Sequence, residues 1–300
     1  MSQKLPITVL MLTLNEEYHL PGILDNIQNW AEDVFIVDSL STDRTVDIAL
    51  DRGVKIVQRR FTSFADQWNF ALSLPIKTPW VMKMDPDERL SDELRQSITE
   101  GIHNEDATGF SVDCRLWFMG KPLHSKLRVT RVWRHNKGHF PEMVVNEHIK
   151  IDGQVLHLPG FLEHLDSCNL HRWMAKQNLY TSMLAITTYQ QNPLEVTPNL
   201  FGSRRQRVVF FKKYFWKIPF RYQLMFLQLY FGRGLWRDGK VGLDWVNARI
   251  MMRRLVEMKM REFETFQQVP EIPKAPAGEF DPRVVNSELQ AMVYPDYDVH

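Results

Sequence analysis

Short apolar runs alternate with helical patterns from residue 7 to residue 102, and this alternation restricts the fold more than any other feature of the sequence. The expected strands are residues 7–14, 34–38, 54–58 and 80–85, and the expected helices are residues 18–30, 43–52, 64–74 and 92–102. Within the first helix Leu20, Ile23 and Ile27 recur at the spacing of one helix face. Strands separated by helices predict an α/β fold, with a mixed, mostly parallel sheet flanked by helices.

The pattern changes from residue 109 onward. Residues 109–118, 127–133, 143–149 and 155–158 have the composition of strands in hairpins, with turn residues between them. Long helical patterns then cover residues 170–189 and 241–263, and the chain from Val269 is rich in proline. We therefore expect a catalytic domain over residues 1–195, a basic, aromatic and amphipathic helical region over 196–265, and an extended proline-containing tail over 266–300.

The cysteines and the apolar runs bear on the compartment. Cys114 and Cys168 form no CxxC pair, so the sequence predicts neither a disulfide framework nor a zinc site. Residues 7–14 are too short for a signal peptide and lead directly into acidic residues, and no apolar run is long enough to span a bilayer. A cytoplasmic protein is expected, and any membrane contact would be at the surface.

Polar side chains collect where the expected strands end. Those that follow the first, second and fourth strands are Thr13, Asn15, Glu16 and Glu17, then Asp38, Ser41, Thr42 and Asp43, then Asp85, Asp87 and Glu88. In an open α/β sheet, ligands bind at the carboxyl ends of the strands. Crowded carboxylates repel one another unless a cation offsets them, and Mg²⁺ or Mn²⁺ takes oxygen ligands from carboxylates and substrate phosphates. The sequence therefore predicts a divalent cation and a diphosphate at Asp85-Pro86-Asp87.

Several of these residues also have an ordinary structural explanation. A DxD triplet occurs by chance in many chains. Asp43 could simply cap a helix, and Glu16 and Glu17 could simply stabilise the first turn of a helix. Their joint position after successive strands favours a common site.

Several motifs in one order resemble family 2 glycosyltransferases of the A-type fold, and in particular the branch that glycosylates lipopolysaccharide core or related envelope glycans. That branch usually reads VDSGSTD, then a segment like GFGxQKNxA, then DADE and HEH. The matching segments here are TLNEE at 13–17, VDSLSTDRT at 37–45, SFADQWNFA at 63–71, DPDE at 85–88, NEH at 146–148 and KQNLY at 176–180. The resemblance extends over residues 5–190 and is weaker over residues 232–262.

The resemblance implies a nucleotide-sugar site. Asn15, Glu17 and Asp38 would contact the nucleoside, and Asp85 would face the ribose or the diphosphate. A UDP-sugar is the expected donor. The complete implied set of donor-binding residues is Thr13, Asn15, Glu17, Asp38, Ser41, Asp43, Gln67, Asn69 and Asp85.

The resemblance also implies the catalytic groups. Asp87 would be a ligand of the Mg²⁺ or Mn²⁺ ion, and His164 or His148 would complete its coordination or orient the base. Glu147 would be the general base that removes a proton from the acceptor hydroxyl, and it must lie within hydrogen-bond reach of that hydroxyl. One displacement at the anomeric carbon inverts its configuration.

Three residues depart from the family pattern. Leu40 stands where the family usually has glycine, so the turn after the second strand lacks the conformational freedom of glycine. Pro86 replaces a small residue in the acidic motif, and Asn146 replaces a histidine. The last change puts a metal or acid role at position 146 in doubt.

Residues 200–236 combine aromatic and basic side chains, and no acidic residue occurs there before Asp238. Anionic lipid attracts such segments, and aromatic rings prefer the membrane interface. We expect a surface anchor on an anionic membrane, at its cytoplasmic face, that serves a lipid-linked or other glycan acceptor. Single-stranded nucleic acid is the less favoured partner, and a packed helical hairpin is the structural alternative. Homo-oligomer formation stays open.

Other functions fit the sequence less well. A nucleotidyltransferase would need a glycine-rich basic loop after the first strand, but residues 12–17 are acidic and contain no glycine. A dinucleotide oxidoreductase would need GxGxxG after a strand. A processive synthase would need a QxxRW motif and spanning helices. An inactive membrane scaffold is the remaining alternative, although Asp85, Asp87 and Glu147 are all present.

Overall fold

The computed structural model describes residues 4–141, 149–166, 169–190, 197–271 and 278–293. The chain forms two compact units. The first comprises Met1–Leu116, Lys126–Asp166 and Lys274–His300, and the second comprises Trp117–Ser125 and Ser167–Pro273. The units are described separately below.

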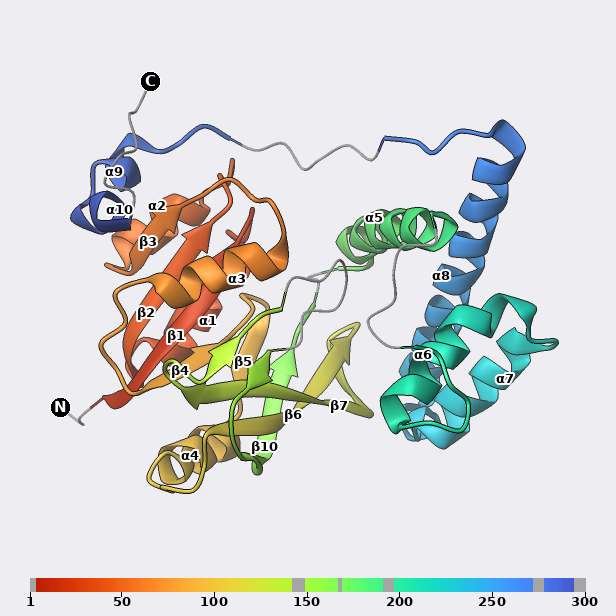
Figure 1. Ribbon diagram of the computed structural model, residues 1–300, viewed down its shortest axis with the longest axis horizontal. Helices are drawn as coiled ribbons and strands as arrows, with labels where there is room; N and C mark the ends of the chain where they lie inside the picture. The colour runs from red at the N-terminus through yellow and green to blue at the C-terminus, as the bar shows by residue number, and fades with distance from the viewer. Residues whose placement is uncertain (1–3, 142–148, 167–168, 191–196, 272–277, 294–300) are drawn as a thin grey trace. The chain divides into compact units, whose positions relative to one another are not determined.

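The first unit is built on one sheet with the strand order β3-β2-β1-β4-β7-β6-β10-β5. Its N-terminal half contains β1 (Leu5–Thr13), α1 (Leu20–Ile27), β2 (Ala31–Asp38), α2 (Thr45–Asp51), β3 (Lys55–Gln58), α3 (Phe64–Ser73) and β4 (Trp80–Lys83). The β1–β2, β1–β4 and β2–β3 pairs are all parallel. Their carboxyl ends therefore meet at one edge of the sheet, as predicted (Figure 1).

The other half of the sheet is mixed. It contains β5 (Glu88–Leu90), β6 (Gly109–Phe118), β7 (Lys121–Arg134) and β10 (Val155–His164), with α4 (Asp92–Gly101) between β5 and β6. The β4–β7 and β5–β10 pairs are antiparallel, whereas β6 and β10 are parallel. A separate short ladder joins β8 (Gly138–His139) and β9 (Lys150–Ile151). The predicted mixed, mostly parallel sheet flanked by helices is confirmed.

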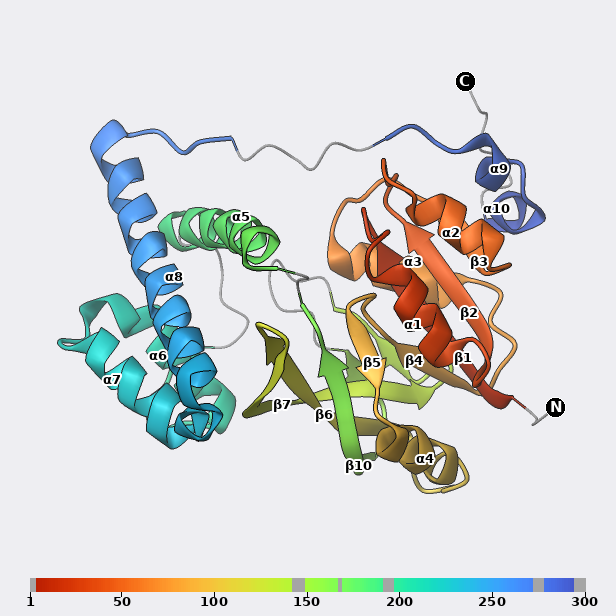
Figure 2. The same ribbon diagram turned by 180° about the vertical axis from the view of Figure 1, so that it is seen from behind.

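Alternating side chains of β1 and β2 divide the core between the two faces of the sheet. Ile7, Val9 and Met11 pack on one face with α1, α2 and α4. Leu10 and Phe35 pack on the other face with α3. Figure 1 shows α3 in front of the sheet, and Figure 2 shows α1 in front of it from behind. Both faces are covered, which explains why these strands are continuous apolar runs.

The C-terminal residues differ from the extended tail that the sequence predicts. Two short helices, α9 (Pro282–Val285) and α10 (Glu288–Val293), lie against β3 in both views (Figures 1 and 2). Val284 is wholly buried in the core, and Gln290 exchanges two hydrogen bonds of 2.9 and 3.0 Å with the backbone of Gln58. This packing covers the outer edge of the sheet, because β3 is the last strand in its order.

Apart from the end of β6 and the start of β7 within Trp117–Ser125, the second unit is helical among its described residues. Its main helices are α5 (Leu170–Tyr189), α6 (Arg204–Tyr214), α7 (Arg221–Leu227) and α8 (Gly239–Phe266), with short 3-10 helices at Phe215–Lys217 and Leu235–Asp238 and a π-helical turn at Gln228–Gly232. α5 packs along α8, and the rings of Phe118, Trp173 and Trp245 contact one another. α5 thus packs within the helical unit, although it falls inside the range 1–195 that the sequence predicts for the catalytic domain. No helix in the described parts of the chain is long and apolar enough to cross a bilayer.

Candidate active site

The carboxylate of Asp38 ends β2 and is wholly buried. Thr13 Oγ1 donates to its Oδ1 over 2.8 Å, and the Ser41 amide and Gln58 Nε2 donate to its Oδ2 over 2.9 and 3.0 Å. Both carboxylate oxygens therefore have donors from the protein itself. Asp38 therefore links the ends of three neighbouring strands through hydrogen bonds. Its contact with a nucleoside stays a prediction.

The loops after β1 and β2 are tied to each other by side chain to backbone hydrogen bonds. Asn15 donates its amide to Ser41 Oγ over 2.9 Å and accepts from the Thr42 amide over 2.8 Å. Glu17 donates its amide to Asp43 Oδ2 over 3.0 Å. The structure therefore brings the predicted residues of these two loops together at the carboxyl edge of the sheet.

The structure shows how Leu40 is accommodated at the position where the family pattern has glycine. It adopts φ 65°, in the left-handed region that glycine normally occupies, while its side chain is fully buried. Its carbonyl accepts a hydrogen bond of 2.8 Å from the Gly278 amide of the C-terminal segment. The turn keeps a conformation suited to glycine, and burial of the leucine side chain offsets the strain.

The predicted residues Gln67 and Asn69 of α3 are both engaged by the chain. Gln67 is buried, donates to Ser39 Oγ over 3.1 Å and accepts from Arg59 Nη1 over 2.9 Å. The Asn69 side chain donates to the carbonyl of Phe140 over 2.7 Å and accepts from its amide over 3.0 Å. Gln67 thus supports the loop after β2, and Asn69 holds the backbone at Phe140. Donor contacts for both residues remain predictions.

A buried ionic cluster surrounds the turn between β4 and β5. Arg131 of β7 bonds Asp85 Oδ2 over 3.0 Å and also pairs with Glu88, which is fully buried. Burial alone would raise the pKa of Asp85, but the charges of Lys83 and Arg131 outweigh it and hold that pKa below its ordinary value. Burial raises the pKa of Glu88 to about 7, against the opposing charge of Arg131. Asp85 is therefore kept ionised and partly exposed at the strand end.

Asp87, His164 and Asp166 form a cluster with metal-ligand geometry. One ligand atom from each lies within 4.8 Å of the others, and His164 Nε2 is 3.1 Å from Asp87 Oδ2. The antiparallel β5–β10 pairing produces this juxtaposition, since His164 lies opposite Glu88 and the Leu165 amide donates to the Asp87 carbonyl. Burial opposes the charge of His164, yet its hydrogen bonds with Asp87 and Cys114 raise its pKa well above the ordinary value.

These donors fit a divalent cation. Two carboxylates and an imidazole suit Mn²⁺ and related ions, and Mg²⁺ accepts the carboxylates. Asp166 has φ 48°, an uncommon conformation outside glycine, which is often retained where a side chain has a function. Asp87 and His164, the two metal ligands that the sequence predicts, are both in this cluster.

Sequence reasoning did not single out Lys83, Arg131 or Asp166. A lysine inside the apolar run of β4 was the available signal for Lys83, and the closeness of Asp166 to His164 was the signal for that residue. Nothing in the local pattern around Arg131 links it to Asp85. The predicted base Glu147 lies outside the described residues, as do Asn146 and His148.

Comparison with known proteins finds curated relatives that are named as glycosyltransferases. The lipopolysaccharide core biosynthesis glycosyltransferase LpsC of Rhizobium meliloti is 29% identical over 254 residues, which covers 81% of this chain and 87% of LpsC. An uncharacterized glycosyltransferase of Rickettsia typhi is 26% identical over 59% of this chain and 65% of its own length.

Solved structures with a similar arrangement have low sequence identity and TM-scores below 0.5. S. aureus TarS, residues 1–349, is 13% identical and covers 89% of this chain and 92% of that one, with a TM-score of 0.43. Glucosyl-3-phosphoglycerate synthase of Mycobacterium tuberculosis, solved with Mn²⁺, UDP and glucosyl-3-phosphoglycerate, is 14% identical over 60% of this chain and 78% of its own, with a TM-score of 0.36. The sequence match is more decisive: the model of glycosyl transferase family 2 covers residues 8–158, half of the chain, and this protein belongs to that family and is a glycosyltransferase.

Proposed function

We propose that this glycosyltransferase transfers one sugar per encounter from a UDP-sugar to a hydroxyl group of a lipid-linked envelope glycan, with inversion and with a divalent cation. The observation that carries the proposal is the cluster of Asp87, His164 and Asp166 beside the ionised Asp85. LpsC, a relative over most of the chain, is named for lipopolysaccharide core biosynthesis, and this supports the same class of acceptor here.

The residues of this cluster would hold the cation. Asp87, Asp166 and His164 would supply its protein ligands, and the cation would take up the negative charge that develops on the leaving diphosphate. Asp85 lies next to them and is held ionised by Arg131 and Lys83, so it can accept hydrogen bonds from the ribose hydroxyls. Because the cation would offset the charge of the leaving diphosphate, no side chain would need to donate a proton to it.

The loops after β1 and β2 would bind the nucleoside. Their backbones are fixed by Asn15, Asp38 and Asp43 before any ligand arrives, which lowers the entropic cost of ordering the site. Ser41, Thr42 and Asp43 also line a pocket of about 250 Å³ together with residues of the C-terminal segment. A polar pocket of this kind suits the edges of a base or ribose.

Glu147 would act as the general base at the acceptor hydroxyl. It follows Phe140 along the chain, and Asn69 anchors the Phe140 backbone through two hydrogen bonds. We propose that Asn69 helps to position the segment that carries the base. One in-line displacement at the anomeric carbon then gives the inverted product.

A thermal-shift experiment tests the nucleotide and the metal together. UDP with Mn²⁺ should raise the melting temperature more than UDP alone, GDP with Mn²⁺ or Mn²⁺ alone, because ligands that bind the native state stabilise it. Asp87→Asn should remove the Mn²⁺-dependent part of the UDP shift and lower sugar transfer by about a hundredfold or more, as expected when transition-state charge stabilisation is lost.

Asp106→Asn is the matched control, since Asp106 is exposed in the turn before β6. It should leave both measurements unchanged. If Asp87→Asn keeps the Mn²⁺-dependent shift and the transfer activity, the proposed metal site is wrong. If no nucleoside diphosphate shifts the parent protein, the donor class is wrong as well.

A further inference from the structure

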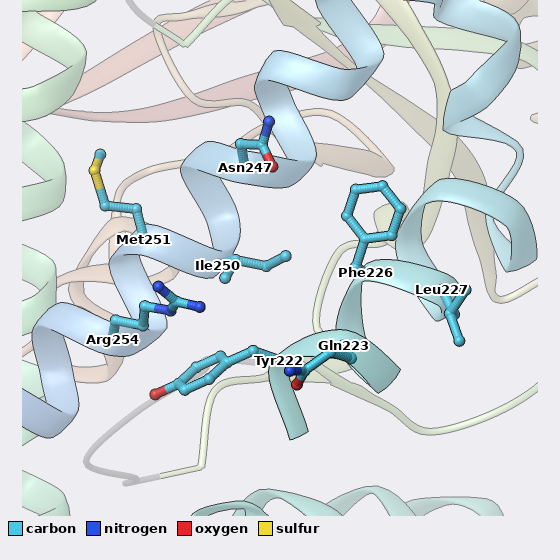
Figure 3. A pocket seen from close by; sticks show the side chains of 8 residues that line it. All are labelled: Tyr222, Gln223, Phe226, Leu227, Asn247, Ile250, Met251 and Arg254. Atoms are coloured by element: carbon cyan, nitrogen blue, oxygen red, sulfur yellow. The ribbon is translucent and has the colours of Figure 1, made fainter. Parts of the chain in front are cut away.

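A groove of about 530 Å³ lies between α7 and α8 of the helical unit. Figure 3 shows Ile250 of α8 pointing across it toward α7, where Phe226 lies, with Arg254 and Tyr222 at one end. The residues that line the groove are Tyr222, Gln223, Phe226, Leu227, Asn247, Ile250, Met251 and Arg254. Its floor is therefore mostly apolar, and its end carries one cation.

The groove is held open by polar contacts at the start of α7. Arg221 Nη2 donates to both carboxylate oxygens of Glu257 over 2.6 and 2.7 Å, and the Tyr222 hydroxyl also donates to Glu257. These bonds fix the first turn of α7 to α8. They therefore position the apolar residues of α7 that follow Arg221 and those of α8 that precede Glu257, without filling the space between them.

The apolar character continues beyond the groove onto the surface. Leu224, Leu227, Phe231 and Met251 are all exposed, between 46 and 58%. Exposed apolar side chains beside an apolar groove favour contact with another molecule. This face thus has the composition of a surface that meets an apolar ligand.

The segment of the chain that contains α7 is rich in positive charge. Residues 200–237 contain no acidic residue, and the basic ones are Arg204, Arg205, Arg207, Lys212, Lys213, Lys217, Arg221, Arg233 and Arg237. Arg254 lies over the Tyr222 ring at 4.8 Å and forms no ion pair with any residue that the structure describes. An anionic headgroup at Arg254 would complement this charge, whereas a neutral apolar partner would leave it unmatched.

We propose that the groove between α7 and α8 binds one acyl chain of an anionic membrane phospholipid, with the lipid phosphate at Arg254. Arg254 lies at one end of the groove, so a phosphate bound there would leave the apolar remainder of the groove for the acyl chain. The inference deepens the proposed function, and it rests on that proposal only for the idea that the acceptor lies in a membrane.

Co-sedimentation of the full chain with phosphatidylcholine–phosphatidylglycerol vesicles tests the groove. Met251→Glu places a carboxylate in the groove and should weaken binding by about tenfold, because it repels the headgroup and hydrates the apolar wall. Met258→Glu is the matched control. Met258 is also an exposed methionine of α8, 57% exposed, but it does not line the groove. It should change binding by less than about threefold, since it adds the same charge at a surface position.

Arg254→Gln tests the headgroup contact. It should reduce the preference for phosphatidylglycerol over pure phosphatidylcholine vesicles while leaving the weak binding to phosphatidylcholine unchanged. A phospholipid with a photoreactive group in its acyl chain should label peptides of α7 and α8 in the parent protein and not in Met251→Glu.

Three results would overturn the proposal. Equal weakening by Met251→Glu and Met258→Glu would indicate a diffuse charged surface, and labelling outside α7 and α8 would locate the lipid elsewhere. A change of oligomeric state in Met251→Glu without lipid would instead make the groove an interface between two copies. The UDP–Mn²⁺ thermal shift is measured on every variant, so a folding defect and a failure of the donor proposal are both separated from a failure to bind lipid.

Discussion

At the scale of single residues, two contributions to stability oppose each other at Leu40: the strain of its backbone and the packing of its side chain. A left-handed conformation costs a non-glycine residue about 1 kcal/mol. A buried leucine side chain contributes more than this, because Leu→Ala changes in cores cost about 2–5 kcal/mol. Packing of the leucine side chain therefore contributes more to stability than its left-handed conformation costs.

We predict that Leu40→Gly lowers the free energy of unfolding by about 1–4 kcal/mol, the loss of packing minus the relieved strain. Leu40→Ala is the control, because alanine loses the same packing and keeps the strain. It should be less stable than Leu40→Gly by about 1 kcal/mol. Denaturant unfolding measures both differences. Equal stability of the two variants would mean that the turn relaxes out of the left-handed region.

Arg131 is the residue on which the acidic turn depends most. It pairs with Asp85 and Glu88, and its side chain is only 11% exposed. Removing one member of a buried ion pair leaves an uncompensated charge, at a cost of about 3–5 kcal/mol. Glu88, whose pKa is raised to about 7, can reduce this cost by taking up a proton.

We predict that Arg131→Gln lowers the free energy of unfolding by about 3 kcal/mol at neutral pH, which denaturant unfolding measures. Arg128→Gln is a matched control on the same strand. Arg128 is 59% exposed and pairs with Asp113 at 3.4 Å, so its loss should cost less than about 1 kcal/mol. Equal losses in the two variants would refute a special role for Arg131.

At the scale of elements, a bulge in β10 brings His164 to the site. The β10–β6 register shifts between His157 and Phe161, and Gly160 within the bulge has φ 91°. A Cβ at Gly160 would overlap the backbone of Leu94 at the start of α4. Bulges re-aim the strand that carries them, and here the strand beyond the bulge pairs with β5 and sets His164 beside Asp87.

Gly160→Ala should therefore lower the free energy of unfolding by about 3 kcal/mol or more, since it adds a backbone clash to the left-handed strain. Gly53→Ala separates the two effects. Gly53 has φ 64°, but no described atom lies within 4 Å of its would-be Cβ, so this variant should lose only about 1 kcal/mol. Thermal and denaturant unfolding give both values. A Gly160→Ala loss no greater than that of Gly53→Ala would show that α4 moves freely.

The sequence predicts elements well where burial imposes a regular spacing. The helix expected over residues 170–189 has those bounds, and Ser91 caps α4 as expected, accepting from the Leu94 amide over 3.2 Å. The short strand β5 was missed, because its three residues have no period and its pairing with β10 depends on residues far along the chain. The expected strand over 143–149 lies almost wholly outside the described residues.

The candidate site follows the same rule. The position of Asp85 and Asp87 at a strand end could be predicted from the sequence pattern, because the ends of parallel strands converge whatever the details of packing, whereas His164 was expected only from the family resemblance and as an alternative to His148. The internal hydrogen bonds of Asp38, Gln67 and Asn69 could not, since each partner comes from a separate loop or strand. The local sequence pattern thus predicts which residues lie at the candidate site. Tertiary packing decides which of their polar atoms remain available to a ligand.

At the scale of the whole molecule, the end of the chain completes the fold of its beginning. β3 is an edge strand, and an exposed edge invites pairing with other chains. The C-terminal segment over 278–293 covers it through Gln290 and Val284, and Arg283 pairs with Asp47 of α2 at 2.7 Å. The same segment contacts Leu40 and lines the pocket beside Ser41, so we expect its loss to affect both the stability of the fold and the proposed donor site.

We predict that a chain ending at residue 271 loses protection of the β3 amides and binds UDP with Mn²⁺ more weakly than the full chain. The Gln58 amide is the most informative probe in hydrogen exchange, because its acceptor is the side chain of Gln290. Removing the cover should speed its exchange by about tenfold or more, the effect of losing about 1.4 kcal/mol of local stability. The truncated chain should also self-associate through the bared edge of β3.

Arg283→Gln in the full chain is the control for charge alone. Arg283 is 57% exposed, so losing its ion pairs with Asp47 and Asp281 should have little effect on stability and leave Gln58 protected. If truncation leaves the exchange rate of the Gln58 amide unchanged, the C-terminal segment does not protect β3. If the Gln58 amide exchanges faster but the affinity for UDP is unchanged, the C-terminal segment acts only at the edge of the sheet. The loops after β1 and β2 would then hold their conformation through Asn15, Asp38 and Asp43 alone.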